Sequence, residues 1–281
     1  MHYSFDFAQQ MHFPSNPLQP GPMYFLTPRK CGLFGVSCEG LQKQVNFLID
    51  KGMSSGKGSN EVISYMNHFF THFGVGETDV DLHYDNCTGQ NKNNFMLWYG
   101  AWRVAHKLHF TLNTHFPIAG HTKFGSDCGF GLIKQAYKRI RVSTLADIAK
   151  VVKTALLKVT STSHSWSDWK MLVNTFDWQA HLSPYFRKLP QIKSYQYFSF
   201  HTNRPGVVIA RTHSDAEPVS FQRCVTRKFY PLSSVFLPCL HLDWPRTDRL
   251  IFIQRLGLSV PMKRRTLHDQ HHKHRVAHRG G

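Results

Sequence analysis

Residues 80–94 read VDLHYDNCTGQNKNN and contain a strand, a turn and the start of a helix. Apolar and polar residues alternate from residue 80 to residue 84, which is the pattern of a half-buried strand. The loop NCTGQ follows, and residues 91–106 (NKNNFMLWYGAWRVAH) have the apolar and aromatic content of a helix that packs into a core. Asp85 therefore stands at the end of a strand, on its polar side.

The same alternation occurs at the start of the chain. In residues 2–8, Tyr3, Phe5 and Phe7 point to one face of a predicted strand, and Asp6 points to the other. A third aspartate, Asp127, lies at the first turn of a helix that Ser126 can cap. If the strands of Asp6 and Asp85 are parallel neighbours, their carboxylates lie side by side, and Asp127 closes the cluster.

The remaining pattern predicts an α/β fold, in which a mixed sheet is flanked by helices. A loop is expected over 13–28, with turn residues at Arg29, Lys30 and Gly32. Strands are expected at 23–26, 33–39 and 110–118, helices at 59–73 (capped by Ser59), 130–140 and 145–158, and a hairpin at 195–210. We expect a core over 1–210, an ill-defined extension over 211–262 and a disordered, basic, His-rich tail over 263–281.

The charge balance points to a polyanionic partner. The chain has 34 Lys and Arg against 17 Asp and Glu, a formal net charge of +17, which suits nucleic acid first and an anionic membrane second. No apolar stretch approaches the roughly 20 residues needed to span a bilayer, and MHYSFDFAQQ lacks the features of a signal peptide. The six cysteines contain no CxxC pair. We therefore expect free thiols, an intracellular reducing location and no membrane partner.

Three convergent carboxylates suit hard divalent cations such as Mg²⁺ or Mn²⁺. Two such ions activate a water or a 3′-hydroxyl and stabilise a leaving oxygen in phosphodiester chemistry. The predicted metal ligands and catalytic residues are accordingly Asp6, Asp85 and Asp127.

The order of these elements and acidic positions resembles the ribonuclease-H-like cores of transposases and retroviral integrases. Their carboxylates lie on the first strand, the fourth strand and a following helix. More specifically, FDFAQQ, TPRKCGLFGV, HYDNCTGQNKNN and AGHTKFGSDCGFGLIK resemble an uncharacterised transposon-associated domain family, over roughly residues 1–210.

The resemblance implies a metal-dependent nuclease or strand transferase that acts on DNA in the nucleus, uses no small-molecule substrate and forms homo-oligomers. It also implies that Asn86, Gln90, Asn91, Lys92 and His121 lie near the carboxylates. Asp6 is close to the first methionine, and the sequence after residue 221 departs from the family. A truncated or decayed copy is therefore expected, and a non-catalytic nucleic-acid-binding or scaffold protein is the alternative.

Each site residue also has an ordinary structural interpretation. Asp85 could form a polar turn, Asp127 could stabilise a helix N-terminus, and Asp6 could be a surface residue of an edge strand. His121 could be a hydrogen-bonded loop residue. The cations predicted to follow a phosphate backbone could instead form a solvated helix face; they are Lys134, Lys138, Arg139 and Arg141.

The aromatic and histidine clusters have ordinary structural explanations. Phe95, Trp98, Tyr99 and Trp102 recur at helical spacing and are expected in the core. The histidines between residues 68 and 115 match no standard zinc spacing.

Overall fold

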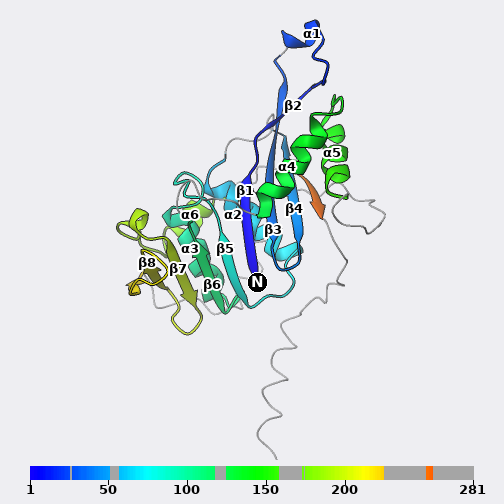
Figure 1. Cartoon of the computed structure of the whole chain (residues 1–281). Helices are drawn as coiled ribbons and strands as arrows, with labels where there is room; N and C mark the ends of the chain where they lie inside the picture. The colour runs from blue at the N-terminus through cyan, green and yellow to red at the C-terminus, as the bar shows by residue number, and fades with distance from the viewer. Residues whose placement is uncertain are drawn as a thin grey trace, which may run out of the picture.

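The chain forms one mixed sheet with helices on both faces (Figure 1). The computed structural model describes residues 1–25, 27–50, 57–117, 125–157, 173, 175–224 and 251–255. The strand order is β10-β4-β3-β1-β5-β6-β7-β8-β9, and β2 pairs with β3 beside this path. The strands are β1 His2–Phe7, β2 Met11–Phe13, β3 Arg29–Cys38, β4 Lys43–Asp50, β5 Asp79–His83, β6 Thr111–His115, β7 Tyr197–His201, β8 Val207–Arg211, β9 Val219–Gln222 and β10 Ile251–Arg255.

The three strands at the centre of the sheet run in the same direction. β1 is parallel to β5, and β5 is parallel to β6, whereas β3, β4, β7, β8 and β9 join through antiparallel pairs. Parallel neighbours need a crossover connection. Here α2 (Ser59–His72) precedes β5 and α3 (Asn94–Ala105) connects β5 to β6, so these helices lie over one face.

Two apolar cores lie on opposite faces of the sheet. The first joins α2, α3 and α6 (Trp178–Leu182) to the aromatic side chains of the central strands. The second joins α4 (Gly125–Tyr137) and α5 (Leu145–Leu157) to Leu33, Leu48 and the buried residues of β2. Both sheet faces are therefore covered at least in part, as the α/β interpretation predicted.

Most of the predicted helices and strands are present, with shifted ends. Helix α2 starts at Ser59, but its N-cap is Gly58, whose backbone N–H donates to the Glu61 carboxylate at 3.1 Å. Helix α4 starts one residue before the predicted cap Ser126. The predicted hairpin corresponds to β7 and β8, which are antiparallel.

Three local predictions were wrong. Residues 21–24 form a short helix, α1 (Gly21–Tyr24), where a strand was expected over 23–26, because Pro22 suits the first turn of a helix. Arg29, Lys30 and Gly32 belong to β3 because they pair with β2 and β4. Strand β4 was missed, although Val45, Phe47 and Ile49 alternate in it.

The C-terminal half contributes further strands to the same sheet. β9 and β10 fall in the predicted extension over 211–262 and pair with β8 and β4. The predicted tail over 263–281 lies outside the described residues. None of the described helices is long and apolar enough to span a membrane.

Candidate functional site

Two of the three predicted carboxylates belong to neighbouring parallel strands, because Asp6 lies on β1 and Asp85 follows the end of β5 by two residues. β1 and β5 pair Tyr3 with Leu82 and Ser4 with His83. The stacked rings of Phe5 and Tyr84, with centroids 4.7 Å apart, continue this register by one residue. One further step of this register would bring Asp6 next to Asp85 on the same face, and the charge of Asp85 acts on Asp6. Both side chains are half-buried.

The charges of Asp85 and Asp127 affect the pKa of Asp6. The pKa of Asp6 is raised to about 6, chiefly by burial and in smaller part by the carboxylates of Asp85 and Asp127. The backbone N–H of Phe7, which donates to Asp6 Oδ1 at 2.7 Å, and the ammonium of Lys57 act in the opposite direction and lower this pKa. Asp85 and Asp127 therefore each repel the charged form of Asp6, and a bound cation would relieve that repulsion.

Asp127 is brought to this face by a close contact between α4 and the sheet. A Cβ atom on Gly125 would lie 2.9 Å from Ser37 Oγ and 3.5 Å from Ser4 Oγ, so the helix start almost touches β1 and β3. Asp127, two residues later, is exposed. Among the described residues, no three His, Cys, Asp or Glu side chains are grouped so that they could hold a metal ion by themselves.

The loop after β5 fixes the Asp85 carboxylate. Asp85 Oδ1 accepts hydrogen bonds from the backbone N–H of Cys87 at 3.2 Å and from Asn91 Nδ2 at 2.5 Å. The carbonyl of Cys87 in turn accepts from the backbone N–H groups of Gln90, Asn91 and Lys92. The polar turn predicted as the ordinary structural alternative is thus present, and it holds the carboxylate beside Asp6.

Lys92 is buried and links this loop to other parts of the fold. Its Nζ donates to Asn86 Oδ1 and to Gln196 Oε1, both at 3.0 Å, and lies 5.1 Å from the ring centroid of Phe116. Burial lowers its pKa. Asn86 Nδ2 donates to the carbonyl of Pro117. Lys92 therefore ties the loop to the end of β6 and to the residue before β7.

The last two asparagines of the motif hold helices in place. Asn93 Oδ1 caps α3 by accepting from the backbone N–H groups of Phe95 at 3.1 Å and Met96 at 3.2 Å. Asn94 Oδ1 accepts from the backbone N–H of Leu189 at 2.6 Å. Asn93 and Asn94 therefore have structural roles at the start of α3.

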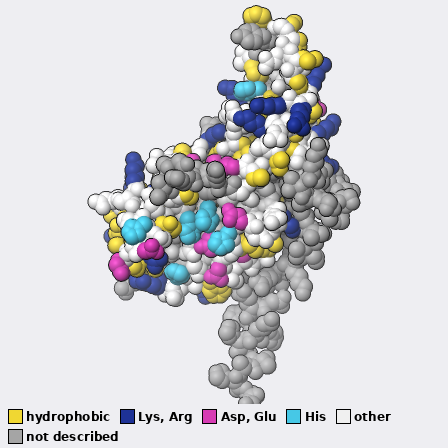
Figure 2. All heavy atoms as spheres, in the orientation of Figure 1, with side chains coloured by type: hydrophobic (Ala, Val, Ile, Leu, Met, Phe, Trp, Pro, Cys, Tyr) yellow, Lys and Arg dark blue, Asp and Glu magenta, His cyan; other side chains and the backbone are white. Residues whose placement is uncertain are grey.

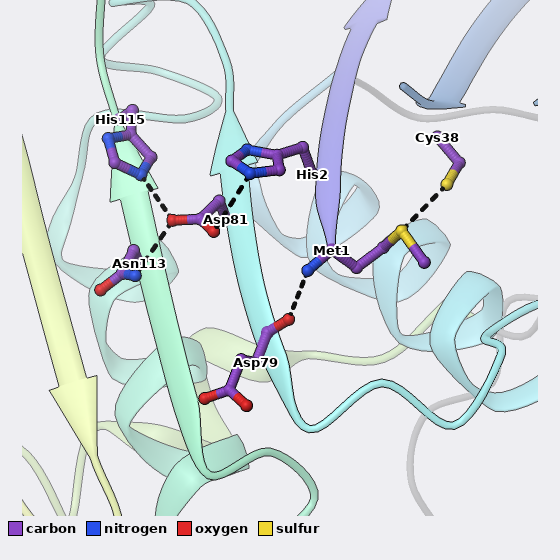
Figure 3. Close-up of polar contacts among 7 residues, drawn as sticks. All are labelled: Met1, His2, Cys38, Asp79, Asp81, Asn113 and His115. Atoms are coloured by element: carbon purple, nitrogen blue, oxygen red, sulfur yellow. Dashed lines mark hydrogen bonds and ion pairs between the residues drawn. The ribbon is translucent and has the colours of Figure 1, made fainter. Parts of the chain in front are cut away.

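The same polar face carries a cluster that sequence reasoning missed (Figure 3). Asp81 Oδ1 lies 3.1 Å from His115 Nε2 and accepts from Asn113 Nδ2 at 3.0 Å, and Asp81 Oδ2 lies 3.8 Å from His2 Nε2. Burial would raise the pKa of Asp81, but the hydrogen bonds from His115 and Asn113 bring it below its usual value. His83 stacks on His115, with ring centroids 4.6 Å apart. The alternation of Asp81, His83 and Asp85 was the signal available in the sequence.

The predicted nucleic-acid-binding cations are exposed, and Lys134 Nζ donates to Gln9 Oε1 at 2.8 Å. Figure 2 shows Lys and Arg side chains gathered between the projecting segment and the body of the molecule. His121 lies outside the described residues. The predicted stripe from Phe95 to Trp102 packs in or against the first core.

Fold and site together define an α/β protein with a central mixed sheet, flanking helices and a carboxylate at the end of each of two neighbouring parallel strands. The family described as "Domain of unknown function (DUF7869)" matches residues 27–217, and the chain belongs to this family. Asp85 and Asp127 lie inside the matched range, and Asp6 precedes it. No curated protein and no solved structure matches the chain.

Proposed function

We propose that this domain is a metal-dependent core that cleaves or joins DNA phosphodiesters, with a ribonuclease-H-like fold related to transposase and integrase cores. The chain order of the acidic residues supports this. Asp6 lies on the first strand, Asp85 follows β5, which is the fourth strand if the three-residue β2 is set aside, and Asp127 lies on the later helix α4. A DNA substrate makes the nucleus the expected location, and joint processing of two DNA ends would need at least two copies.

The observation that carries the proposal is the parallel pairing of β1 with β5, whose register, continued two residues beyond Ser4 and His83, would bring Asp6 next to Asp85. Mg²⁺ commonly takes one or two protein carboxylates and completes its shell with water and substrate phosphate. A pair therefore suffices for the first ligands, and Asp127 is a further candidate. Asn91 Oδ1, which is buried and has no hydrogen-bond partner among the described residues, is a neutral oxygen of the type that the same cation accepts.

The residues of this chain would bind the cation, hold the Asp85 carboxylate in place and attract the DNA backbone. Mg²⁺ or Mn²⁺, when bound by Asp6 and Asp85 with Asp127, supplies Lewis-acid activation of the attacking oxygen and stabilisation of the leaving oxygen. Asp6 is ionised above about pH 6 and is then able to bind a cation. Asn91 and the Cys87 backbone fix Asp85. The exposed cations in the last turn of α4 and directly after it attract the phosphate backbone.

The test is cleavage or joining of labelled DNA in Mg²⁺, in Mn²⁺ and in EDTA, with Asp85→Asn and Asp79→Asn as a matched pair. Asn keeps the oxygen that accepts from Cys87 and Asn91 but loses the charge. We expect Asp85→Asn to lower the rate roughly 10²–10³-fold while the fold is retained. Asp79, on the same face at the other end of β5, should tolerate the change. Activity that survives in Asp85→Asn would place the active site elsewhere.

A non-catalytic nucleic-acid-binding protein derived from a transposase is the second candidate. The observation that favours it is the exposure of Asp127, together with the lack of a preformed group of three metal-binding side chains in the described ranges. DNA binding in EDTA with no turnover in any divalent cation would support this candidate over the first.

A further inference from the structure

A narrow segment projects from the body of the molecule directly after the candidate site (Figure 1). We call it the arm and define it as residues 8–25 and 27–30. It leaves β1 two residues after Asp6, where the backbone N–H of Ala8 donates to the carbonyl of Leu33 at 2.9 Å. It includes β2, which pairs with the first residues of β3, and α1 near its tip.

The arm is anchored at its root. Met11 and Phe13 are buried in the second core with α4 and α5. Ser15 and Val142 exchange two backbone hydrogen bonds, of 2.7 and 2.9 Å. Tyr137 Oη donates to the carbonyl of His12 at 2.6 Å. These contacts fix the direction in which the arm leaves the body.

The tip of the arm is apolar and exposed. The sequence from Phe13 to Pro28, FPSNPLQPGPMYFLTP, contains no charged residue. Leu18 is 88% exposed and Phe25 is 86% exposed, more than the other large hydrophobic side chains in the described part of the chain. Both side chains are mostly exposed to solvent, and large apolar side chains exposed close together can form a contact surface.

Cations surround the root of the arm. We call this set the neck; its exposed members are Lys30, Lys134, Lys138, Arg139 and Arg141. No acidic residue occurs in residues 8–30 or in residues 134–141. Arg29 is left out because it pairs with Asp50 at 2.6 Å. The neck is therefore a local excess of positive charge between the tip and the carboxylate pair.

We propose that the arm and neck grip duplex DNA, with the neck on the phosphates and Leu18 and Phe25 acting as an apolar wedge between base pairs. Phe and Leu are side chains that unstack and kink a duplex in this way. Charge favours DNA over a second copy of this chain, since the neck and a molecule of net charge +17 repel each other. It also disfavours a membrane, because the cations lie at the root rather than around the apolar tip.

The proposal deepens the proposed function, since a wedge held by an arm that starts beside Asp6 would present a distorted phosphodiester to Asp6 and Asp85. The test uses the full chain, in EDTA, with a duplex that contains 2-aminopurine, whose fluorescence rises when it is unstacked. Three variants are compared with wild type: Leu18→Ser with Phe25→Ser at the tip, Lys138→Ala with Arg139→Ala and Arg141→Ala at the neck, and Phe110→Ser as the control. Phe110 is 55% exposed and lies between α3 and β6, outside the arm.

We expect wild type and Phe110→Ser to raise the fluorescence. The tip variant should lose that rise and about tenfold in affinity, because stacking of a side chain on a base contributes roughly this much or more. It should keep the slope of log affinity against log salt. The neck variant should lower that slope by roughly 0.9 for each phosphate that its missing cations no longer neutralise.

Three outcomes would overturn the proposal: no duplex binding by wild type, an unchanged fluorescence rise in the tip variant, or a tip variant that loses only its binding to anionic phospholipid vesicles. The last would assign the tip to membranes. The comparison of Asp85→Asn with wild type in Mg²⁺ is independent of this experiment. If cleavage depends on Asp85 but the tip variant unstacks DNA like wild type, the proposed function is supported and the wedge is excluded. If the tip variant loses the fluorescence rise but no cleavage is seen, the wedge is supported and the proposed function is not.

Discussion

The two faces of the central strands bury different kinds of side chain, although alternate residues of the same strands build both. In β1, Tyr3 and Phe5 are buried toward α2, while Ser4 and Asp6 face α4. The face toward α2 and α3 is filled by aromatic rings. Phe34 alone lies within 6 Å, centroid to centroid, of four other rings.

The face toward α4 keeps polar atoms that packing does not require. Ser4 Oγ, Asn46 Nδ2 and Ser126 Oγ are buried, and within the described ranges they have no hydrogen-bond partner. An unpartnered buried polar group costs free energy, roughly 1–3 kcal/mol each. Tyr84 Oη and Thr114 Oγ1, on the aromatic face, also have no partner in the described ranges. The faces therefore differ in the kind of side chain they bury, with aromatic rings on one and serine and asparagine on the other.

The largest loss of stability should come from removing a side chain of the aromatic face. Phe5→Ala removes a fully buried ring that packs on Phe34 and Tyr84, and it should cost about 3–5 kcal/mol of unfolding free energy. Denaturant unfolding measures it. Phe25→Ala, at the exposed tip, is the matched control and should change stability by less than about 0.5 kcal/mol. Equal effects would contradict the assignment of the core.

The next largest loss of stability should come from the loop between β5 and α3. Lys92→Met keeps the length of the side chain but leaves Asn86 Oδ1 and Gln196 Oε1 without their donor, which should cost about 2 kcal/mol. Lys138→Met, at an exposed site, should be nearly neutral. If Lys92 instead served to bind phosphate, Lys92→Met would lose DNA affinity while its unfolding free energy stayed that of wild type.

Local periodicity predicted the aromatic face well. The alternation in β1 and β5 and the helical spacing in α2 follow from side chains that share one buried face. Position in the sheet was harder to predict. The pairing of β1 with β5 was a condition attached to the site, because strand order depends on tertiary contacts that period-2 patterns do not encode.

Other features had weak or misleading local signals. The charged ends of β3, Arg29 and Lys30, resemble a turn until their partners on β2 are known. The roles of Asn91 and Lys92 depend on which side-chain atoms meet across the loop, so the motif indicated only that they would lie near Asp85.

A smaller effect should separate the charge of the polar face from its packing. Because the folded pKa of Asp6, about 6, exceeds the roughly 4 of an unfolded chain, the native state binds more protons between these values. Wild-type stability should therefore fall as pH rises through that window and remain reduced above it.

Asp6→Asn should then be more stable than wild type by about 1–2 kcal/mol at pH 7.5, after allowance for solvent screening, and the gain should fade toward pH 4. Melting temperatures at both pH values, with and without Mg²⁺, measure it. Mg²⁺ should stabilise wild type more than Asp6→Asn. A gain that is the same at both pH values would show that the carboxylate does not carry the effect.

The smallest effect tests how closely α4 lies on the polar face. Gly131 has open space around the position of a Cβ atom, so Gly131→Ala should stabilise the helix by about 0.5–1 kcal/mol. A Cβ on Gly129 would lie 2.1 Å from Gln44 Oε1, and Gln44 is buried and donates to Asn46 Oδ1 at 2.8 Å. Gly129→Ala should therefore destabilise, since the same gain in helix propensity is outweighed by displacement of Gln44. Denaturant unfolding of the two variants decides the sign of each. If both stabilise the protein, α4 lies further from β3 and β4 than the structure has it, and Asp127 lies further from Asp6.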